Sequence, residues 1–252
     1  MQRFFVFIFL FSLTQAWAQL DNLPLQWHNK NGINTISVAT DYQIQTITTD
    51  SGTKHILHAD QANACLQKGM PSLPYFAAPL LMPDVKGLQA LIIDSTFIVL
   101  NNIDLLPSKG DISRNINPDE VAYTFGKEFN TDAFYPQNIL QHQEVFRFRD
   151  FYGQNIFITP FQYNPVKKQL RIYTRLTLLL PPTNQPVKKV TAPFNYLYES
   201  QFLNATAFMQ NGSSKPGNML IIANPAFMNA MEPFINWKKQ TGMDVNMVSI
   251  NS

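Results

Sequence analysis

The side chains best suited to covalent chemistry lie in the first third of the chain. Cys65 is the single cysteine, and His55 and His58 are the imidazoles nearest to it in sequence. A thiol acts as a nucleophile only when its pKa is lowered and a base accepts its proton, and spacing shows neither condition. We therefore expect Cys65 to be a small buried apolar residue. Because it is alone, the chain has no internal disulfide.

His55 and His58 also have the spacing of a metal-binding pair. Residues three apart on a β-strand face opposite sides of the sheet, so a strand here would separate the two imidazoles. The sequence contains neither a G-x-S-x-G motif nor a glycine-rich phosphate loop. We accordingly assign no catalytic, cofactor-binding or metal-binding residue, and we expect no cofactor.

The composition favours a globular protein with a sizeable core. The chain has 252 residues, of which 45% are hydrophobic and 14% charged, with a net charge of +2. This is not the composition of a disordered chain. The basic residues are scattered along the sequence, which argues against a nucleic-acid partner.

The first eighteen residues have the pattern of a signal peptide. Arg3 provides a positive charge, residues 4–13 form an apolar run, and Ala16 and Ala18 flank Trp17 as in a cleavage site. We expect cleavage after Ala18 and export of the chain to the cell surface or the extracellular space, with the periplasm as a possible transit compartment. The apolar run is too short to span a bilayer, so we expect no stable membrane span after its removal.

The clearest structural pattern runs from residue 154 to residue 180 and predicts a β-hairpin. Six residues of the second arm point one way by their period-2 spacing, and Arg171, Tyr173, Arg175 and Thr177 point the other way. Asn164-Pro165 supplies the turn, since asparagine bonds its own backbone and proline presets φ. The apolar face consists of Leu170, Ile172, Thr174, Leu176, Leu178 and Leu180.

Further strands are predicted across residues 19–180. Alternating apolar residues occur between 20 and 58, with a turn at 50–52, and again between 88 and 100, where Asp94-Ser95 predicts a break into two arms. Four prolines in 68–83 predict an edge strand or packed loop, because proline donates no hydrogen bond to a central ladder. A short strand is also expected at Val121–Phe125.

Residues 181–218 are rich in proline and polar residues, and we expect them to connect two domains, with a short helical piece around Glu199–Phe208. Exposed linkers are where proteases cut most readily, so Lys188-Lys189 is a candidate processing site.

The last stretch, residues 219–252, has a different architecture. Residues 219–223 are all apolar, as in a buried parallel strand. Asn224 and Pro225 then have the types preferred at a helix start, and Gly242 the type preferred just past a helix end. A second strand follows, which completes a βαβ unit. Because such a unit leaves sheet edges uncovered, we expect it to be the truncated start of an α/β domain.

Two regions resemble the amino-terminal part of gingipain-type cysteine peptidase precursors. The first is Lys68–Pro74 together with Phe157–Pro165 and the strand that follows it; the second is 219–250, with the string Trp237–Gly242. The resemblance implies the fold class: a mainly β, antiparallel sandwich or barrel-like propeptide domain over 19–180, followed by an incomplete α/β segment of the caspase-like catalytic domain over 219–252.

The resemblance also implies a function. Such a precursor is a secreted zymogen, in which the propeptide assists folding and inhibits its partner, the peptidase catalytic domain, in cis or in trans. A His/Cys dyad would perform the endopeptidase chemistry. Residues 219–252 contain neither type, so we expect the dyad to lie beyond this chain and the 252 residues alone to be inactive.

In zymogens of this kind, a propeptide loop can place a basic side chain in the substrate cleft. Arg147 and Arg149 share one face of a predicted strand beside the turn at 150–155, and they are our candidate inhibitory residues.

Two alternatives remain open. The chain could be a secreted or surface β-sandwich module that binds protein or glycan without a peptidase role. It could also belong to a secretion or surface-processing system that reuses the caspase-like fold.

Overall fold

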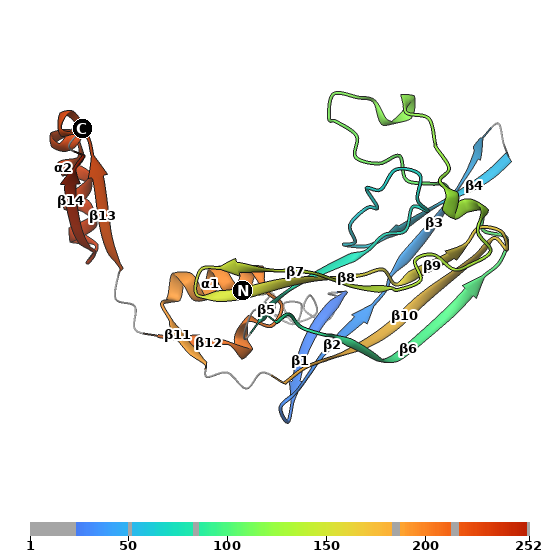
Figure 1. The fold of residues 1–252 in the computed structure, drawn as a ribbon, viewed down its shortest axis with the longest axis horizontal. Coiled ribbons are helices and arrows are strands. Elements are labelled where there is room, and N and C mark those ends of the chain that lie inside the picture. Colours follow the sequence, from blue (N-terminus) through green and yellow to red (C-terminus); the bar gives the residue numbers. More distant parts are fainter. Residues whose placement is uncertain (1–23, 50–51, 83–85, 183–186, 213–216, 251–252) are drawn as a thin grey trace, which may run out of the picture. The chain divides into compact units, whose positions relative to one another are not determined.

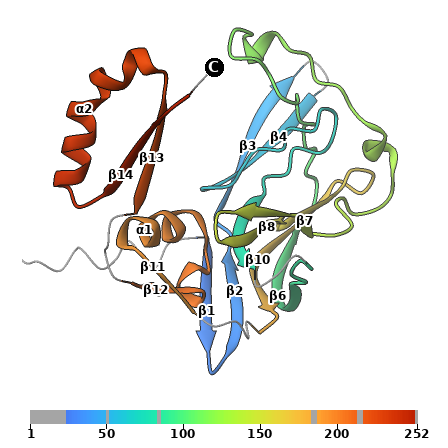
Figure 2. The same ribbon diagram turned by 60° about the vertical axis from the view of Figure 1, so that its left-hand side comes forward.

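The computed structural model describes residues 24–49, 52–82, 86–182, 187–212 and 217–250, and it separates into two units near residue 183 (Figures 1 and 2). Predictions on the signal peptide, on Ala18 and on the turn at 50–52 fall wholly or partly outside the described residues. The described residues of the first unit form ten strands: β1 (Leu25–Lys30), β2 (Ile33–Ala39), β3 (Tyr42–Thr49), β4 (Gly52–Ala59), β5 (Phe76–Met82), β6 (Leu91–Leu100), β7 (Leu140–Phe148), β8 (Phe151–Ile158), β9 (Phe161–Asn164) and β10 (Gln169–Leu180).

The largest sheet is built around β10. Its strands follow the order β1-β2-β10-β6, with β9 paired to one end of β10, and all neighbours are antiparallel. The alternation predicted for β10 is confirmed, because Leu170, Ile172 and Leu176 have no exposed surface whereas Arg171 and Tyr173 between them are partly exposed. The predicted turn is also confirmed: the Asn164 side chain accepts a hydrogen bond from the Lys167 amide at 3.0 Å.

The first arm of the predicted hairpin belongs to two sheets rather than one. Only β9 pairs with β10, whereas β8 lies between β5 and β7 in a separate three-stranded sheet. The chain crosses between the sheets at Thr159-Pro160, where Thr159 donates to Ile139 and Pro160 accepts from Tyr173, both at 2.8 Å. Proline fits this crossing because it has no amide proton to donate.

The two sheets lie against each other in both views (Figures 1 and 2). Between them lie fully buried residues of both sheets, among them Ile36, Ala78, Ile156, Ile158 and Leu178. This is the antiparallel sandwich expected from the sequence. The proline-containing segment forms β5 at one edge of the three-stranded sheet, as predicted.

A second part of the core lies beneath the β3–β4 hairpin. Apolar residues of β4, β9, β10 and two connecting segments pack there against one another. The buried members are Leu57, Leu73, Leu105, Phe161, Tyr163, Leu170 and Ile172.

Two strand predictions were wrong. The break expected at Asp94-Ser95 is absent, because β6 continues through it with two register shifts against β10, which accommodate the polar residues without ending the strand. The strand expected at Val121–Phe125 is not formed, since that stretch belongs to an irregular segment. β6 is also unusual in exposing several large apolar side chains at the edge of its sheet, including Ile93 and Phe97.

The second unit begins with folded elements inside the expected connection at 181–218. Strands β11 (Lys188–Val190) and β12 (Met209–Asn211) pair in parallel, and between them lie α1 (Ala192–Gln201) and the short 3-10 helix η3 (Ala205–Ala207). Burial of Tyr198 and Phe202 explains the difference, because aromatic residues among the prolines give the stretch a local core.

The predicted βαβ unit is present at the end of the chain. Strands β13 (Asn218–Ala223) and β14 (Asp244–Ser249) are parallel, and α2 (Pro225–Gln240) connects them. The Asn224 side chain caps α2 by accepting from the Ala226 amide at 3.0 Å, and Gly242 has a φ of 86° after its last turn. Leu220 and Ile222 on β13 are more than half exposed, at 62% and 59%.

The burial pattern of the main sheet predicts the cost of truncating its residues. Replacing Ile172, which has 0% exposed surface, with alanine should lower the free energy of unfolding by about 2–5 kcal/mol. The matched change Ile93→Ala, at a residue 55% exposed in the same sheet, should alter it by less than about 0.5 kcal/mol. Urea denaturation followed by circular dichroism measures both. Equal losses in the two variants would contradict the burial assigned to these strands.

Candidate functional site

The segment between β6 and β7 is the most irregular part of the first unit. Residues 101–139 contain only two short 3-10 helices, η1 (Pro118–Glu120) and η2 (Lys127–Asn130), and part of the segment extends away from the sheets (Figure 1). Long irregular segments on a rigid scaffold commonly carry function.

Its first limb is fixed by the buried side chain of Tyr163 on β9. The Tyr163 hydroxyl donates to the carbonyl of Ile103 at 2.9 Å and accepts from the amide of Leu105 at 3.1 Å. Burial raises the pKa of this phenol, the hydrogen bond from Leu105 opposes that rise, and the charge of Asp104 adds to it. The phenol therefore stays protonated and keeps both bonds at neutral pH.

Asp104 adds an electrostatic attachment at the same point. Its carboxylate oxygens lie 3.1 Å from Lys54 Nζ on β4 and 2.9 Å from Lys168 Nζ in the β9–β10 turn. Burial acts to raise the pKa of Asp104, but the hydrogen bonds and charges of the two lysines outweigh it, so the pKa lies below its ordinary value. His55 Nδ1 also accepts the Asp104 amide proton at 3.0 Å.

The second limb returns to the same hairpin. The backbones of Tyr135 and Tyr163 exchange two hydrogen bonds, of 2.9 and 2.8 Å. The Asp132 carboxylate accepts from the side chain of Asn164 at 2.8 Å and lies 3.3 Å from Lys167 Nζ. Both limbs are therefore attached to the β9–β10 hairpin.

Two glycines bring the segment close to the rest of the unit. The Gly126 amide donates to the Gly69 carbonyl at 2.8 Å, and a Cβ on Gly126 would lie 2.8 Å from that oxygen. Gly69 itself has a φ of 85°, a conformation that disfavours other residues. Only glycine fits this approach of two backbones.

Residues 109–118, which we call the Arg114 loop, are closed at their base. Lys109 Nζ donates to the Pro118 carbonyl at 2.7 Å and lies 4.3 Å from the centre of the Tyr123 ring. The Asn117 side chain accepts from the Asp119 amide and so caps η1. Arg114 occupies a turn within this closed loop, is exposed, and makes no side-chain hydrogen bond or ion pair with any described residue. A preformed loop thus presents a guanidinium to solvent.

The predicted candidates Arg147 and Arg149 lie at the β7–β8 hairpin. The turn of this hairpin is at residues 149–150, not at 150–155, and Arg149 has a φ of 51° there. Arg147 Nε donates to the Arg149 carbonyl at 2.8 Å, and its Nη1 donates to the Tyr152 hydroxyl at 3.0 Å. Arg147 is therefore engaged within the hairpin, whereas Arg149 lies at its tip.

The remaining predicted residues do not form one site: His55 and Cys65 contact the irregular segment through Asp104 and Ser108, whereas Lys188 and Lys189 belong to the second unit. Lys188 and Lys189 are exposed residues of β11. Cys65 is half-buried and unpaired rather than fully buried. His55 is engaged with Asp104, and His58 lies 3.4 Å from the side-chain oxygen of Gln45, so neither imidazole contacts the thiol. Within the described ranges, no three His, Cys, Asp or Glu side chains are grouped as a metal site would require.

Arg114 and its neighbours at 107–118 were assigned neither an element nor a role from the sequence. A single arginine among serine, asparagine and glycine gives no periodic signal. The sequence did offer one signal. Lys109-Gly110 precedes Arg114 and Asn117-Pro118 follows it, and both dipeptides are typical of turns, so they indicate a short loop between two turns.

These features define a class of protein: a β-sandwich domain that presents a basic loop, followed by the opening βαβ unit of an α/β domain. Comparison with known proteins is more specific. The family model Propeptide_C25 matches residues 25–211, and the model of Peptidase family C25 matches residues 212–252. The chain belongs to the C25 propeptide family, and its last residues are the start of a C25 peptidase domain.

Two curated relatives come from Porphyromonas gingivalis. Gingipain R2 of strain W83 is 34% identical over 187 residues, which is 70% of this chain and 25% of the relative. Lys-gingipain is 24% identical over 150 residues, 55% of this chain and 9% of the relative. The chain thus spans about a quarter or less of the length of these relatives.

Two solved structures are also similar. One is the complex of Porphyromonas gingivalis RgpB pro- and mature domains, with a TM-score of 0.66 and 29% identity, covering 74% of this chain and 98% of that one. The other, a study of zymogenic latency of gingipain K, has a TM-score of 0.50 and 17% identity, covering 63% and 92%. The second likeness concerns the fold alone. Neither α1 nor α2 in the described ranges is long and apolar enough to cross a membrane.

The two ion pairs of Asp104 predict a pH-dependent contribution to stability. Because the folded pKa is depressed, the contribution is fully present above the ordinary carboxyl pKa and is lost as the pH falls through the folded value. Asp104→Asn should therefore lower the free energy of unfolding by about 1 kcal/mol at pH 7, the upper end for partly exposed pairs, and by progressively less below pH 4.

Urea denaturation across this pH range measures the effect. Asp60→Asn is the matched control, because Asp60 is exposed and forms no ion pair among the described residues. An Asp104→Asn loss that is independent of pH would show that the ion pairs are not its source.

Proposed function

We propose that this chain carries the latency-conferring propeptide of a secreted cysteine endopeptidase. The β-sandwich unit assists folding of its peptidase domain and inhibits it, and the Arg114 loop occupies the substrate cleft. Family membership supports the propeptide role, and the solved complex of related pro- and mature domains supports the peptidase domain as the partner. The signal-like residues 1–18 support export.

The observation that carries the proposal is the construction of the Arg114 loop. A segment that inhibits from within a cleft must protrude, hold its shape and offer one recognisable side chain. The loop is closed by Lys109 and rooted through Gly126 and Tyr163, so little conformational entropy remains to be lost on binding. The exposed guanidinium of Arg114 matches a carboxylate at the base of a cleft, which it can bind with two parallel hydrogen bonds.

The inhibitory role first assigned to the β7–β8 hairpin remains a proposal for Arg149. That residue is at a hairpin tip, as an inserting residue must be. Arg147 fits the role less well, because its guanidinium already donates to Arg149 and Tyr152. We favour Arg114 over both as the inhibitory residue, because its guanidinium makes no hydrogen bond or ion pair with any described residue.

The chain alone should have no peptidase activity. Cys65 is its single thiol, and no imidazole contacts it within the described residues. Thiol-dependent cleavage that Cys65→Ala abolishes would contradict this expectation.

Inhibition can be measured with mature gingipain R2 of Porphyromonas gingivalis as the probe and an arginyl peptide as its substrate. The purified 252-residue chain should slow cleavage, and Arg114→Ala should raise the inhibition constant about 30-fold or more, the effect of losing a central interface residue. Arg147→Ala is the matched control and should change it by less than about threefold, and Arg149→Ala tests the alternative loop.

Unchanged cleavage in the presence of excess wild-type chain would overturn the proposed function. Loss of inhibition in Arg149→Ala but not in Arg114→Ala would transfer the inhibitory role to the β7–β8 hairpin.

We further propose that Lys188-Lys189 is a processing site. The support is its position between the β-sandwich unit and the βαβ unit, with both side chains exposed. Limited trypsin digestion should cut the folded chain after one of these lysines, and Lys188→Gln combined with Lys189→Gln should slow that cut at least about tenfold, since trypsin requires a basic residue. Mass spectrometry of the fragments identifies the bond. First cleavage at Lys86 or Lys109 in the wild-type chain would contradict the assignment.

A further inference from the structure

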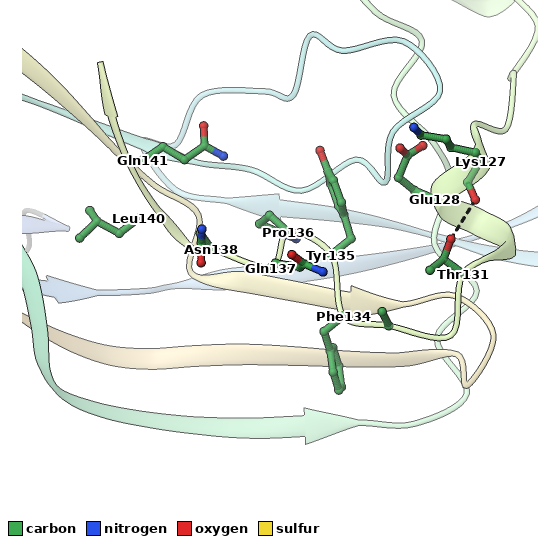
Figure 3. Close-up of a pocket in the computed structure, with 11 residues that line it drawn as sticks. Lys127, Glu128, Thr131, Phe134, Tyr135, Pro136, Gln137, Asn138, Leu140 and Gln141 are labelled. Atoms are coloured by element: carbon green, nitrogen blue, oxygen red, sulfur yellow. Dashed lines mark hydrogen bonds between the residues drawn. The ribbon is translucent and has the colours of Figure 1, made fainter. Parts of the chain in front are cut away.

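Two cavities adjoin one another at the second limb of the irregular segment, around Tyr135. The larger has a volume of about 810 Å³ and is lined by η2 and by the segment that leads into β7 (Figure 3). The smaller, of about 320 Å³, is lined by Cys65–Gln67 and by residues of β7 and β8. Tyr135, Pro136 and Gln141 line both, so the two form one elongated depression, which we call the Tyr135 groove.

The walls of the groove are rich in amide side chains. Primary amides both donate and accept hydrogen bonds, as peptide groups do, so they suit a ligand with a peptide backbone. Figure 3 shows the Gln141 amide and the Tyr135 hydroxyl extending on the same side of the backbone, while Phe134 points to the other side. The amides that line the groove are Gln67, Gln137, Asn138, Gln141 and Gln143.

Glu128 supplies an acceptor with no partner. Its Oε2 atom is buried and makes no hydrogen bond with any described residue, although Glu128 lines the larger cavity. A buried carboxylate oxygen without a partner is costly. Glu128 as a whole is only partly buried and lines the cavity together with Lys127, so a cationic ligand group in the cavity would offset this cost from the exposed side of the carboxylate. The charge of Glu128 also acts on Tyr135. Burial is the main cause that raises the pKa of the Tyr135 phenol, and the charges of Cys65 and Glu128 raise it further.

The backbone of the groove is held firmly. Buried Gln162 donates from Nε2 to the Pro136 carbonyl at 2.8 Å, and its Oε1 accepts from Arg171 Nη1 and the Tyr173 hydroxyl, both at 2.9 Å. The Arg171 guanidinium in turn lies 4.1 Å from the centre of the Phe134 ring. A fixed backbone reduces the entropy lost when a ligand binds.

β7 lies at the edge of its sheet, next to the groove. In the described ranges its outer edge pairs with no strand, and Leu140 and Gln141 at its start line the larger cavity. A peptide in extended conformation can add hydrogen bonds along such an edge, which an oligosaccharide cannot do in register. The edge and the unpartnered carboxylate therefore favour a basic peptide over a neutral glycan.

We propose that the Tyr135 groove binds an extended peptide segment of the peptidase domain that directs an arginine or lysine side chain to Glu128. This inference rests on the proposed function for the identity of the partner. It adds a second contact, beside the Arg114 loop, in which the charges are reversed: the propeptide supplies the anion and the peptidase domain the cation. The loop would then block the cleft while the groove holds the domain in place.

The groove can be tested without the peptidase. The probes are two acetylated, amidated pentapeptides, Thr-Val-Arg-Val-Thr and Thr-Val-Gln-Val-Thr, titrated into the isotope-labelled 252-residue chain by nuclear magnetic resonance. The arginine peptide should shift the side-chain amide signals of Gln141 and Gln143 and bind at least about tenfold more tightly than the glutamine peptide, as expected for a charge-assisted hydrogen bond.

Glu128→Gln should abolish the preference for the arginine peptide. Glu144→Gln is the matched control, because Glu144 is an exposed residue of β7 that does not line the groove. Thermal unfolding of each variant shows whether it is folded, and Gln141→Ala, which leaves the charge in place, provides a second disruption of the groove and should weaken both peptides equally.

Equal binding of both peptides to the wild-type chain, or no binding, would overturn the inference, as would tighter binding of maltopentaose that Glu128→Gln leaves unchanged. These outcomes are distinct from failure of the proposed function. Arg114→Ala should leave peptide binding intact while relieving inhibition of gingipain R2, whereas Glu128→Gln should weaken capture of gingipain R2 by the chain with Arg114 still present.

Discussion

The attachment of the irregular segment at 101–139 to the β9–β10 hairpin is the constraint on which the rest of the first unit depends. Tyr163 attaches the segment at two points. Its buried hydroxyl forms hydrogen bonds with the backbones of Ile103 and Leu105, and its own backbone forms two with Tyr135. Without these bonds, buried backbone groups in both limbs would lack partners, at a cost of about 1–3 kcal/mol each. One residue in the core thus fixes where a long surface segment leaves the fold and where it returns.

This arrangement explains how a loop without regular structure can keep a shape. Contacts with the core fix the two limbs where they leave the sheets, and the Gly69–Gly126 hydrogen bond fixes the backbone between them. The hydrogen bond from Lys109 to Pro118 closes the Arg114 loop. Each attachment uses groups already fixed by neighbouring elements, so the loop loses its freedom during folding and not during binding. The same segment then continues into η2 and the wall of the Tyr135 groove, which places two features of opposite charge on one piece of chain.

Much of the fold was predictable from the sequence because the relevant signals are local. The alternation along β10, the Asn164 turn and the caps of α2 depend on residues close together in the chain, and the structure confirms all three. The division of the first hairpin arm between two sheets was not predictable, because either partner satisfies the period-2 pattern of β8 and β9. The choice depends on β5, which is more than sixty residues away from β8, as well as on the adjacent strand β7.

The candidate site was less predictable from the sequence, for a related reason. Arg147 and Arg149 were selected because a strand and turn could be inferred around them, but the structure gives the Arg147 guanidinium partners within its own hairpin. The position of Arg114 depends on contacts between residues distant in sequence, such as that between Gly69 and Gly126. A loop of small polar residues gives no sequence signal for such contacts. Those two glycines have a wider consequence. Since they hold main chain against main chain, a single methyl group added at Gly126 would force the two backbones apart while every charged side chain remained intact, so a variant can displace this segment without altering Arg114 itself.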